Sequence, residues 1–443
     1  MKLSLYEIAT AVSGKLVNPL KQTITSISTD TRTIIPGALF VPIKGENFDG
    51  HNYIQNAAER GAVCALSEVE MAADIPLIIV NSTRKALMDL AGYYRRLFDI
   101  KVVAITGSAG KTTTKDMIAG ILEQKYKTKK TMKNFNNDIG LPLSIFQLEE
   151  GDEALVLEMG MNHGGEIHEL SLTGAPDIAV ITHIGDAHIE NFENREGILN
   201  AKLEIVDGLK PNGTVILNGD DPLLTGAIAA IKVKPFIAKY PSNENILLTT
   251  PVGLEKTECK FNWAGQDVNI TVPLPGAHMV KNALLAVAVG IELGCTPEQI
   301  TKGFETFAPP AGRLTVEKIG NKTIINDAYN ANPASMKEAI KILATEKGRK
   351  VAILGDMNEL GHVAEERHKE VGAFAGEAGL DLFIAVGGLS KHMYDSFPHT
   401  NKIYFSTVEE FITAGMHLLK EDDIVLIKAS RGMAFERIIT KLQ

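Results

Sequence analysis

Short apolar runs alternate with segments of helical periodicity along most of this chain. The runs are rich in Val, Ile and Leu and end in small or polar residues, as the strands of buried parallel sheets do. They predict strands at 38–43, 76–80, 102–106, 154–158, 178–182, 214–217, 351–354, 382–386, 402–405 and 424–427. Helical patterns are expected over 84–98, over 111–122 and over 277–293. This alternation predicts an α/β fold with parallel sheets.

The length of the chain and the positions of its interrupting segments divide this pattern into three parts. A chain of 443 residues exceeds one ordinary hydrophobic core. The helical segment 84–98 leads directly into the strand at 102–106, and the Pro- and Gly-rich stretch 308–312 interrupts the alternation later. We therefore expect domains at 1–97, 98–311 and 312–443.

Composition and charge exclude several classes of protein. The apolar fraction of 45 % and the charged fraction of 22 % are those of a globular protein. The net charge of −9, without a basic stripe, argues against nucleic acid or an anionic membrane as partner. No segment reaches the ~18 apolar residues that a membrane span needs, and the first residues lack the pattern of a signal peptide. The three widely spaced cysteines fit no zinc or disulfide framework. We expect a soluble, cytoplasmic protein with reduced thiols.

The first candidate functional site is a glycine-containing turn between a predicted strand and a predicted helix. It reads Thr106-Gly107-Ser108-Ala109-Gly110-Lys111-Thr112-Thr113. This order gathers backbone N–H groups and a helix N-terminus around one point, which suits a polyphosphate. Lys111 can reach the outer phosphates, and the Thr112 hydroxyl can ligate magnesium. Ile105 stands where the usual loop has its first glycine, so the motif is contracted. The sequence predicts ATP binding.

Polar residues also close other strands, and the pattern leaves their roles open. Glu158 is either a magnesium ligand or a polar strand terminus. His183 and His188 follow the strand at 178–182, and spacing does not choose between them. Asn137 either caps the next helix or faces the nucleotide. By pattern alone Lys202 is a surface lysine on a helix.

Several motifs together resemble the Mur ligases of peptidoglycan synthesis. They are T-G-S-A-G-K-T-T-T, K-N-F-N-N-D-I-G-L-P, L-E-M-G-M-N, T-H-I-G-D-A-H, A-K-L-E-I and N-G-D-D-P, and the resemblance covers essentially the whole chain. The motifs at 28–32, 44–51, 327–336 and 355–361 are similar to those of the member that adds D-alanyl-D-alanine to UDP-N-acetylmuramoyl-tripeptide.

The resemblance implies an N-terminal UDP-substrate-binding domain, a central ATP-binding domain and a C-terminal Rossmann-like domain that binds the dipeptide and closes on ATP. It also implies a monomer and an acyl-phosphate mechanism. The tripeptide carboxylate attacks the γ-phosphate of ATP, and the amine of D-alanyl-D-alanine then displaces phosphate. Two anions must approach each other in the first step, so cations are needed around the phosphates.

The resemblance also assigns residues to the nucleotide and the metal. The implied ATP contacts are Thr106, Gly107, Ser108, Ala109, Gly110, Lys111, Thr112, Thr113, Asn137, Asn282, Arg313 and Asp327. Two Mg²⁺ sites are implied, with Thr112, Glu158, His188 and a carbamylated Lys202 as ligands. Lys111, His188 and Lys202 take the catalytic roles, and His183 lines the site.

Contacts to the other substrates are implied at both ends of the chain. Ser28, Asp30 and Arg32 are the candidates for the UDP-sugar, and a guanidinium suits its diphosphate. Tyr329, Asn330, Glu359, Ser430 and Arg431 are candidates for the dipeptide side. Capping and surface charge explain Glu359, Ser430 and Arg431 equally well. Tyr329 replaces a lysine that some other Mur ligases place in this motif.

Alternative functions share the phosphate loop. Another Mur ligase or a folylpolyglutamate synthase-type ligase would use the same nucleotide domain, but the latter usually lacks a UDP-binding first domain. A small-molecule kinase would need no amine co-substrate, and a nucleotide switch would need no acceptor. ADP formation that depends on both an acid and an amine separates these functions.

Overall fold

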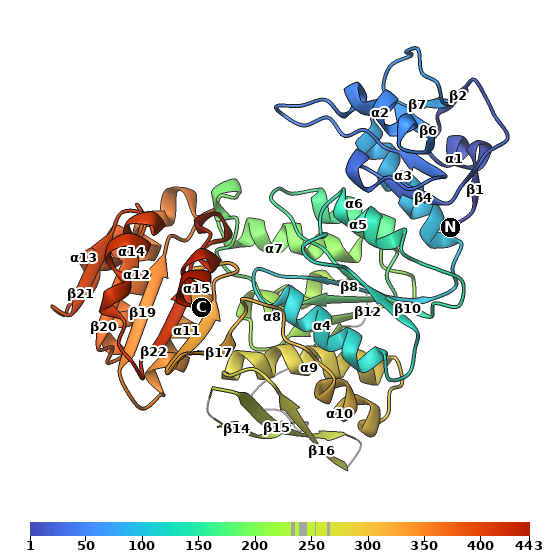
Figure 1. The fold of residues 1–443 in the computed structure, drawn as a ribbon. Helices are drawn as coiled ribbons and strands as arrows, with labels where there is room; N and C mark the ends of the chain where they lie inside the picture. Colours follow the sequence, from blue (N-terminus) through green and yellow to red (C-terminus); the bar gives the residue numbers. More distant parts are fainter. Residues whose placement is uncertain (232–234, 239–245, 253, 264–265) are drawn as a thin grey trace.

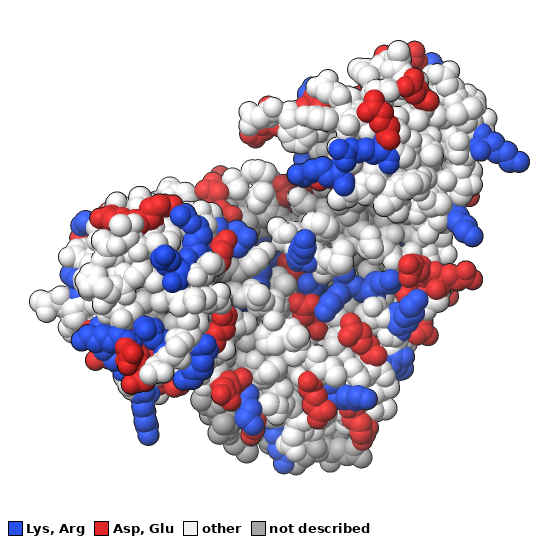
Figure 2. All heavy atoms as spheres, in the orientation of Figure 1, with Lys and Arg blue, Asp and Glu red and all other residues white. Residues whose placement is uncertain are grey.

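The computed structural model describes residues 1–443 except 232–234, 239–245, 253 and 264–265. The chain forms three parts that follow one another in sequence (Figure 1). We call β1 to α3 the N-terminal part, β8 to α10 the middle part and β17 to α15 the C-terminal part. On the face drawn in Figure 2, acidic and basic side chains are interspersed, and a hollow separates the N-terminal part from the C-terminal part.

The N-terminal part has a five-stranded sheet in the order β2-β7-β6-β5-β4 and a two-stranded sheet of β1 and β3. The strands are β1 (Leu3–Ser4), β2 (Lys15–Val17), β3 (Thr23–Ile24), β4 (Ser26–Ser28), β5 (Ala38–Phe40), β6 (Ala62–Ser67) and β7 (Leu77–Ile79). The helices are α1 (Leu5–Ala11), α2 (Ile54–Glu59) and α3 (Thr83–Arg96). α3 also contacts α5 and α6 of the middle part. There Tyr94 donates to the Leu148 carbonyl (2.8 Å) and Arg95 to the Gly174 carbonyl (3.2 Å).

The middle part is built on a parallel sheet in the order β13-β12-β11-β8-β10-β9. The strands are β8 (Lys101–Thr106), β9 (Thr128–Lys130), β10 (Ala154–Glu158), β11 (Ile178–Ile181), β12 (Thr214–Asn218) and β13 (Pro235–Ala238). The helices are α4 (Lys111–Leu122), α5 (Gly140–Ile145), α6 (Glu166–Gly174), α7 (Arg195–Leu203), α8 (Pro222–Gly226), α9 (Ala277–Glu292) and α10 (Pro297–Glu305). An antiparallel sheet of β14 (Ile246–Val252), β15 (Lys256–Trp263) and β16 (Gln266–Val272) packs against α9 and α10.

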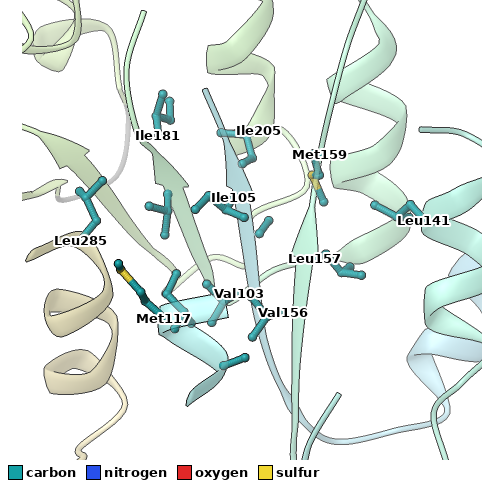
Figure 3. Close-up of a cluster of buried hydrophobic side chains, with 14 of the residues drawn as sticks. Val103, Ile105, Met117, Leu141, Val156, Leu157, Met159, Ile181, Ile205 and Leu285 are labelled. Atoms are coloured by element: carbon teal, nitrogen blue, oxygen red, sulfur yellow. The ribbon is translucent and has the colours of Figure 1, made fainter. Parts of the chain in front are cut away.

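Apolar residues on both faces of β8 explain why this strand lies inside the sheet. Val103 and Ile105 are fully buried, and in Figure 3 they lie among side chains from the neighbouring strands and from α4. Leu285 of α9 belongs to the same core (Figure 3). β8 lies between β10 and β11, and the chain crosses from β10 on one side of β8 to β11 on the other, so the strand order reverses there. Ligands of open α/β sheets bind at the carboxyl ends of strands beside such a point.

The C-terminal part has a second six-stranded sheet in the order β17-β18-β22-β19-β20-β21, in which only β17 is antiparallel to its neighbour. The strands are β17 (Thr315–Ile319), β18 (Lys322–Asp327), β19 (Lys350–Gly355), β20 (Leu382–Val386), β21 (Lys402–Phe405) and β22 (Ile424–Lys428). The helices are α11 (Pro333–Ala344), α12 (Ala364–Glu377), α13 (Ser390–Ser396), α14 (Val408–Ala414) and α15 (Glu436–Leu442). Asn332 caps α11 and Pro333 occupies its first turn, so the Asn-Pro pair marks where this helix begins.

The prediction of an α/β fold is confirmed. Each strand expected from an apolar run is present, with ends that differ by a few residues, and the expected helices are α3, α4 and α9. In the described part of the chain, no helix is both long enough and apolar enough to cross a membrane.

Candidate active site

The phosphate loop joins the end of β8 to the start of α4. Gly107 and Gly110 have φ angles of 148° and 82°, which residues with a β-carbon rarely adopt. A β-carbon on Gly107 would lie 1.8 Å from the Thr182 hydroxyl, and one on Gly110 would lie 2.6 Å from Oδ1 of Asn282. Lys111 Nζ donates to the Gly107 carbonyl (2.7 Å), so its side chain folds back over the loop. These contacts leave the N-terminus of α4 open to an anion.

The segment after β11 holds this loop in place. Ser108 N donates to the His183 carbonyl (2.7 Å), and Gly185 N donates to the Ser108 hydroxyl (2.9 Å). The Thr182 hydroxyl donates to the Ala109 carbonyl. Sequence reasoning missed this role of Thr182, although its position at the end of a predicted strand was the available signal.

Glu158 closes β10 next to the phosphate loop and is buried. Its Oε1 accepts a hydrogen bond from Asn136 Nδ2 (2.9 Å), and its backbone N–H donates to the Thr131 hydroxyl (3.0 Å). Oε2 is buried, accepts no hydrogen bond from the described residues, and lies 4.0 Å from the Lys115 ammonium. A buried carboxylate oxygen without a hydrogen-bond donor is suited to a cation.

Lys202 is buried, with 1 % of its surface exposed, so the pattern-based interpretation of a surface lysine is wrong. The helix α7 points this residue into the molecule, and its amphipathic pattern gave no sign of that. Burial, together with the charge of nearby Lys111, lowers the pKa of Lys202 well below its usual value. Burial also lowers the pKa of Lys111. A lowered pKa favours the neutral form of the Lys202 amine, which is its nucleophilic form.

His188 connects this cluster to the C-terminal part. It has a φ angle of 64°, and its Nδ1 lies 3.1 Å from Oε2 of Glu359. Burial and the charges of Lys111 and Lys202 lower the pKa of His188 to about 3, so its ring is neutral. Burial raises the pKa of Glu359, with Glu190 adding to this shift and Lys111 opposing it.

The strand ends of the C-terminal part contribute further polar groups. Asp327 Oδ2 accepts a hydrogen bond from buried Lys428 (2.6 Å), and Asp327 Oδ1 accepts one from Leu314 N (3.1 Å). Lys428 also donates to the Asn330 carbonyl (2.9 Å). Sequence reasoning missed Lys428, whose signal was a lysine closing an otherwise apolar run. Arg313 lies over the ring of Tyr329, with its guanidinium carbon 4.1 Å from the ring centre.

Comparisons with known proteins identify the family to which this architecture belongs. Three family models match in order: "Mur ligase family, catalytic domain" over residues 23–95, "Mur ligase middle domain" over 105–290, and "Mur ligase, glutamate ligase domain" over 312–431. The UDP-N-acetylmuramoyl-tripeptide–D-alanyl-D-alanine ligase of Bacillus subtilis is 38 % identical over 100 % of this chain and 98 % of its own length. This chain belongs to the Mur ligase family.

Solved structures agree with this assignment of a ligase. MurF from Acinetobacter baumannii superposes with a TM-score of 0.94 at 32 % identity, covering 100 % of this chain and 99 % of its own. MurF from Thermotoga maritima, solved in complex with ADP, has a TM-score of 0.85 at 28 % identity and covers 94 % of this chain and 96 % of its own. The family resemblance expected from the sequence motifs is therefore confirmed.

His183 and Asn137, two residues that the family resemblance places at the site, form hydrogen bonds within the middle part. His183 Nδ1 lies 2.8 Å from Asp221 Oδ2, which also accepts from Ile184 N, so this histidine contacts the residue that caps α8. Asn137 Oδ1 accepts from Ile139 N (3.3 Å) and Gly140 N (2.9 Å), so its side chain stabilises the turn that leads into α5. Its neighbour Asn136, which lies in the same predicted turn, contacts Glu158 instead.

The UDP-sugar candidates of the ligase lie together after β4. Ser28 is buried and its hydroxyl donates to the Asp30 carbonyl (2.8 Å). Asp30 accepts hydrogen bonds from the backbone and from the exposed guanidinium of Arg32 (NH2 to Oδ2, 2.7 Å). These bonds to Arg32 lower the pKa of Asp30. The turn is therefore preformed, and the Arg32 guanidinium is accessible to an anion.

The remaining dipeptide-side candidates meet after β22. The Ser430 hydroxyl accepts from Asn358 N (2.8 Å), and Arg431 N donates to Asn330 Oδ1 (3.4 Å). Arg431 also lies over Tyr329, 5.6 Å from the ring centre. The structure thus brings together Tyr329, Asn330, Ser430 and Arg431 at the carboxyl ends of β18 and β22. Glu359 instead contacts His188 of the middle part.

Proposed function

We propose that this ligase joins D-alanyl-D-alanine to UDP-N-acetylmuramoyl-tripeptide with hydrolysis of ATP to ADP and phosphate. The observation that carries the proposal is the cluster around His188, which contacts Glu359 of the C-terminal part and feels the charges of Lys111, in the phosphate loop, and Lys202. The full-length similarity to ligases of this name supports the choice of substrates.

The roles of the three parts follow from this assignment. The N-terminal part binds the UDP-sugar through Ser28, Asp30 and Arg32. The middle part binds ATP, and the C-terminal part binds the dipeptide and adds Arg313 and Asp327 to the nucleotide. The hollow between the N-terminal and C-terminal parts is compatible with this division, because it gives a long substrate access to the middle part (Figure 2).

The chemistry divides into two steps. The tripeptide carboxylate oxygen attacks the γ-phosphorus of ATP, the bond to the ADP oxygen breaks, and an acyl phosphate forms. The dipeptide amine then attacks the carbonyl carbon and loses a proton, and inorganic phosphate leaves. Lys111 and the backbone N–H groups of the loop stabilise the charge on the transferred phosphoryl group. Excluding water protects the acyl phosphate from hydrolysis.

Magnesium fits the residues present. Thr112, Glu158 and His188 would hold it, and the unpartnered Oε2 of Glu158 supports this choice. Within the described residues, no three His, Cys, Asp or Glu side chains form a metal cluster. Carbamylation of Lys202 would add an anionic ligand, since an amine whose pKa is lowered by burial can add to carbon dioxide and release a proton. When bound, magnesium would screen the negative charge of the phosphates.

The test is phosphate release with ATP and magnesium, supplying the UDP-tripeptide and D-alanyl-D-alanine separately and together. We expect release only with both substrates, and a loss of about a hundredfold or more in Lys111→Ala, because charge stabilisation at the transferred group is removed. Lys101→Ala is the control, since Lys101 is an exposed lysine at the far end of β8. Release with a single amino acid in place of the dipeptide, or with folate and glutamate, would contradict the proposal.

A further inference from the structure

Tyr329 forms an aromatic platform beneath a cation of the C-terminal part. It follows the carboxyl end of β18, and the Arg313 guanidinium carbon lies 4.1 Å from its ring centre. The Arg431 guanidinium carbon lies 5.6 Å from the same centre. Both distances are within the ~6 Å over which a cation is attracted to an aromatic face. One ring therefore contacts two cations that reach it from separate segments of the chain.

The backbone around Arg313 is fixed on both sides. Tyr329 N donates to the Gly312 carbonyl (3.1 Å), and Leu314 N donates to Asp327 Oδ1 (3.1 Å). Gly312 and Leu314 have φ angles of 71° and 55°, so the chain bends sharply there. The residue between them cannot move without breaking these bonds. The orientation of the Arg313 side chain then depends mainly on the ring.

The Arg313 guanidinium is available to a ligand. Within the described parts of the chain it forms no ion pair and no side-chain hydrogen bond, and it contacts the Tyr329 ring. Its charge contributes to lowering the pKa of Lys111, which places it close to the phosphate loop. A guanidinium that contacts a ring through its π system still has N–H groups available for phosphate oxygens.

We propose that Tyr329 is a positioning residue whose ring holds Arg313 in the orientation that binds the nucleotide phosphates. This inference rests on the proposed function, because it takes Arg313 as a nucleotide contact. A preoriented side chain loses less freedom on binding than a mobile one, so the ring raises nucleotide affinity without touching the nucleotide.

The same geometry explains why a lysine is unsuitable at this position of this chain. A lysine here would place a third positive charge beside Arg313 and Arg431. The two guanidinium groups would repel it, and the aromatic face would be lost. Replacing Tyr329 by the lysine of some other Mur ligases should therefore lower nucleotide affinity more than loss of the ring alone.

The experiment measures ADP binding with magnesium by calorimetry in the full chain, and KM values for ATP and for D-alanyl-D-alanine. For Tyr329→Leu we expect nucleotide affinity to fall about fivefold to tenfold, in line with a cation–π contact at a partly buried site. Tyr329→Phe should restore most of the affinity because it keeps the ring, and Tyr329→Lys should be weaker than Tyr329→Leu. The KM for D-alanyl-D-alanine should be unchanged. In an Arg313→Ala background, Tyr329→Leu should have no further effect.

Tyr394 provides the matched control. Its ring contacts the ammonium groups of Lys391 and Lys402 near β21. β21 is an edge strand of the same sheet, four strands away from β18. Tyr394→Leu should leave ADP binding unchanged.

Three results would overturn the proposal. If Tyr329→Phe loses as much affinity as Tyr329→Leu, the hydroxyl and not the ring is responsible. If only the KM for D-alanyl-D-alanine rises, Tyr329 binds the dipeptide. If Tyr329→Leu costs the same with and without Arg313, the ring acts through the fold. ADP binding is measured without the acceptor substrates, so these results stay distinct from a failure of the proposed ligase reaction.

Discussion

At the scale of single residues, burial decides which of the ligase's polar groups differ from ordinary surface groups. Lys202 and Glu158 are almost completely buried, whereas Arg32 and Asp138 are accessible. A charged group that is buried is stable only with a partner, a shifted pKa or a bound ion. Among the described residues, none donates a hydrogen bond to Oε2 of Glu158, and the pKa of Lys202 is lowered by burial.

The carbamate on Lys202 can be tested directly. We expect protein equilibrated with ¹³C-labelled bicarbonate to give a carbamate carbonyl signal in carbon NMR, because burial lowers the pKa of Lys202 and so favours its nucleophilic, neutral form. Lys202→Arg should lack the signal and lose about a hundredfold or more of the activity, since a guanidinium cannot become an anionic ligand. Lys101→Arg is the control and should keep both. A wild-type spectrum without the signal would contradict the assignment.

At the scale of elements, the phosphate loop is shaped as much by its neighbours as by its own glycines. β11 ends beside β8, and the Thr182 hydroxyl occupies the space next to Gly107. Ser108 and Gly185 hydrogen-bond across the same gap. Because the segment after β11 fixes the loop, its N–H groups are already in one arrangement. This lowers the entropy cost of ordering the loop around a phosphate.

Gly107→Ala tests this packing. A β-carbon would lie 1.8 Å from the Thr182 hydroxyl on a backbone with a φ of 148°, so the loop must shift. We expect ADP affinity to fall at least tenfold and stability to fall by about 1–3 kcal/mol, as measured by calorimetry and thermal unfolding. Gly226→Ala is the control, because a β-carbon there meets nothing within 4 Å. Equal behaviour of the two variants would show that the contact with Thr182 is unimportant.

At the scale of the whole molecule, ion pairs join the middle part to the C-terminal part around the site. Arg367 of α12 lies 3.0 Å from Asp186, which also pairs with Arg195 of the middle part. Glu359 reaches His188 nearby. Asp186 and His188 are two residues apart, so the segment that carries the proposed metal ligand is also the one that the C-terminal part contacts. In this arrangement the contacts of the C-terminal part therefore fall on the same segment as His188.

Arg367→Ala should shift the ligase toward a more open arrangement. We expect a larger radius of gyration in small-angle scattering and a rise of about fivefold or more in the KM for D-alanyl-D-alanine, because buried Asp186 loses one of its two guanidinium partners. Added salt should expand the wild type more than the variant. Lys369→Ala, on the same helix and paired only with Glu365 in the described structure, is the control. An unchanged radius and KM in Arg367→Ala would argue against this link.

The sequence by itself determined the strands, the phosphate loop and the family of this protein. Apolar runs bounded by small residues specify buried strands, and the loop's glycines and Lys111 act through local backbone geometry, so both are readable without distant contacts. Only the tertiary structure decided which polar residues meet. Lys202 has the sequence surroundings of a surface lysine, and it is the packing of α7 that buries it beside Lys111. Likewise, Arg313 and Tyr329 are separated by a strand pair, and only the pairing of β17 with β18 brings them together. Burial and side-chain proximity arise from contacts between distant segments, which a local pattern does not encode.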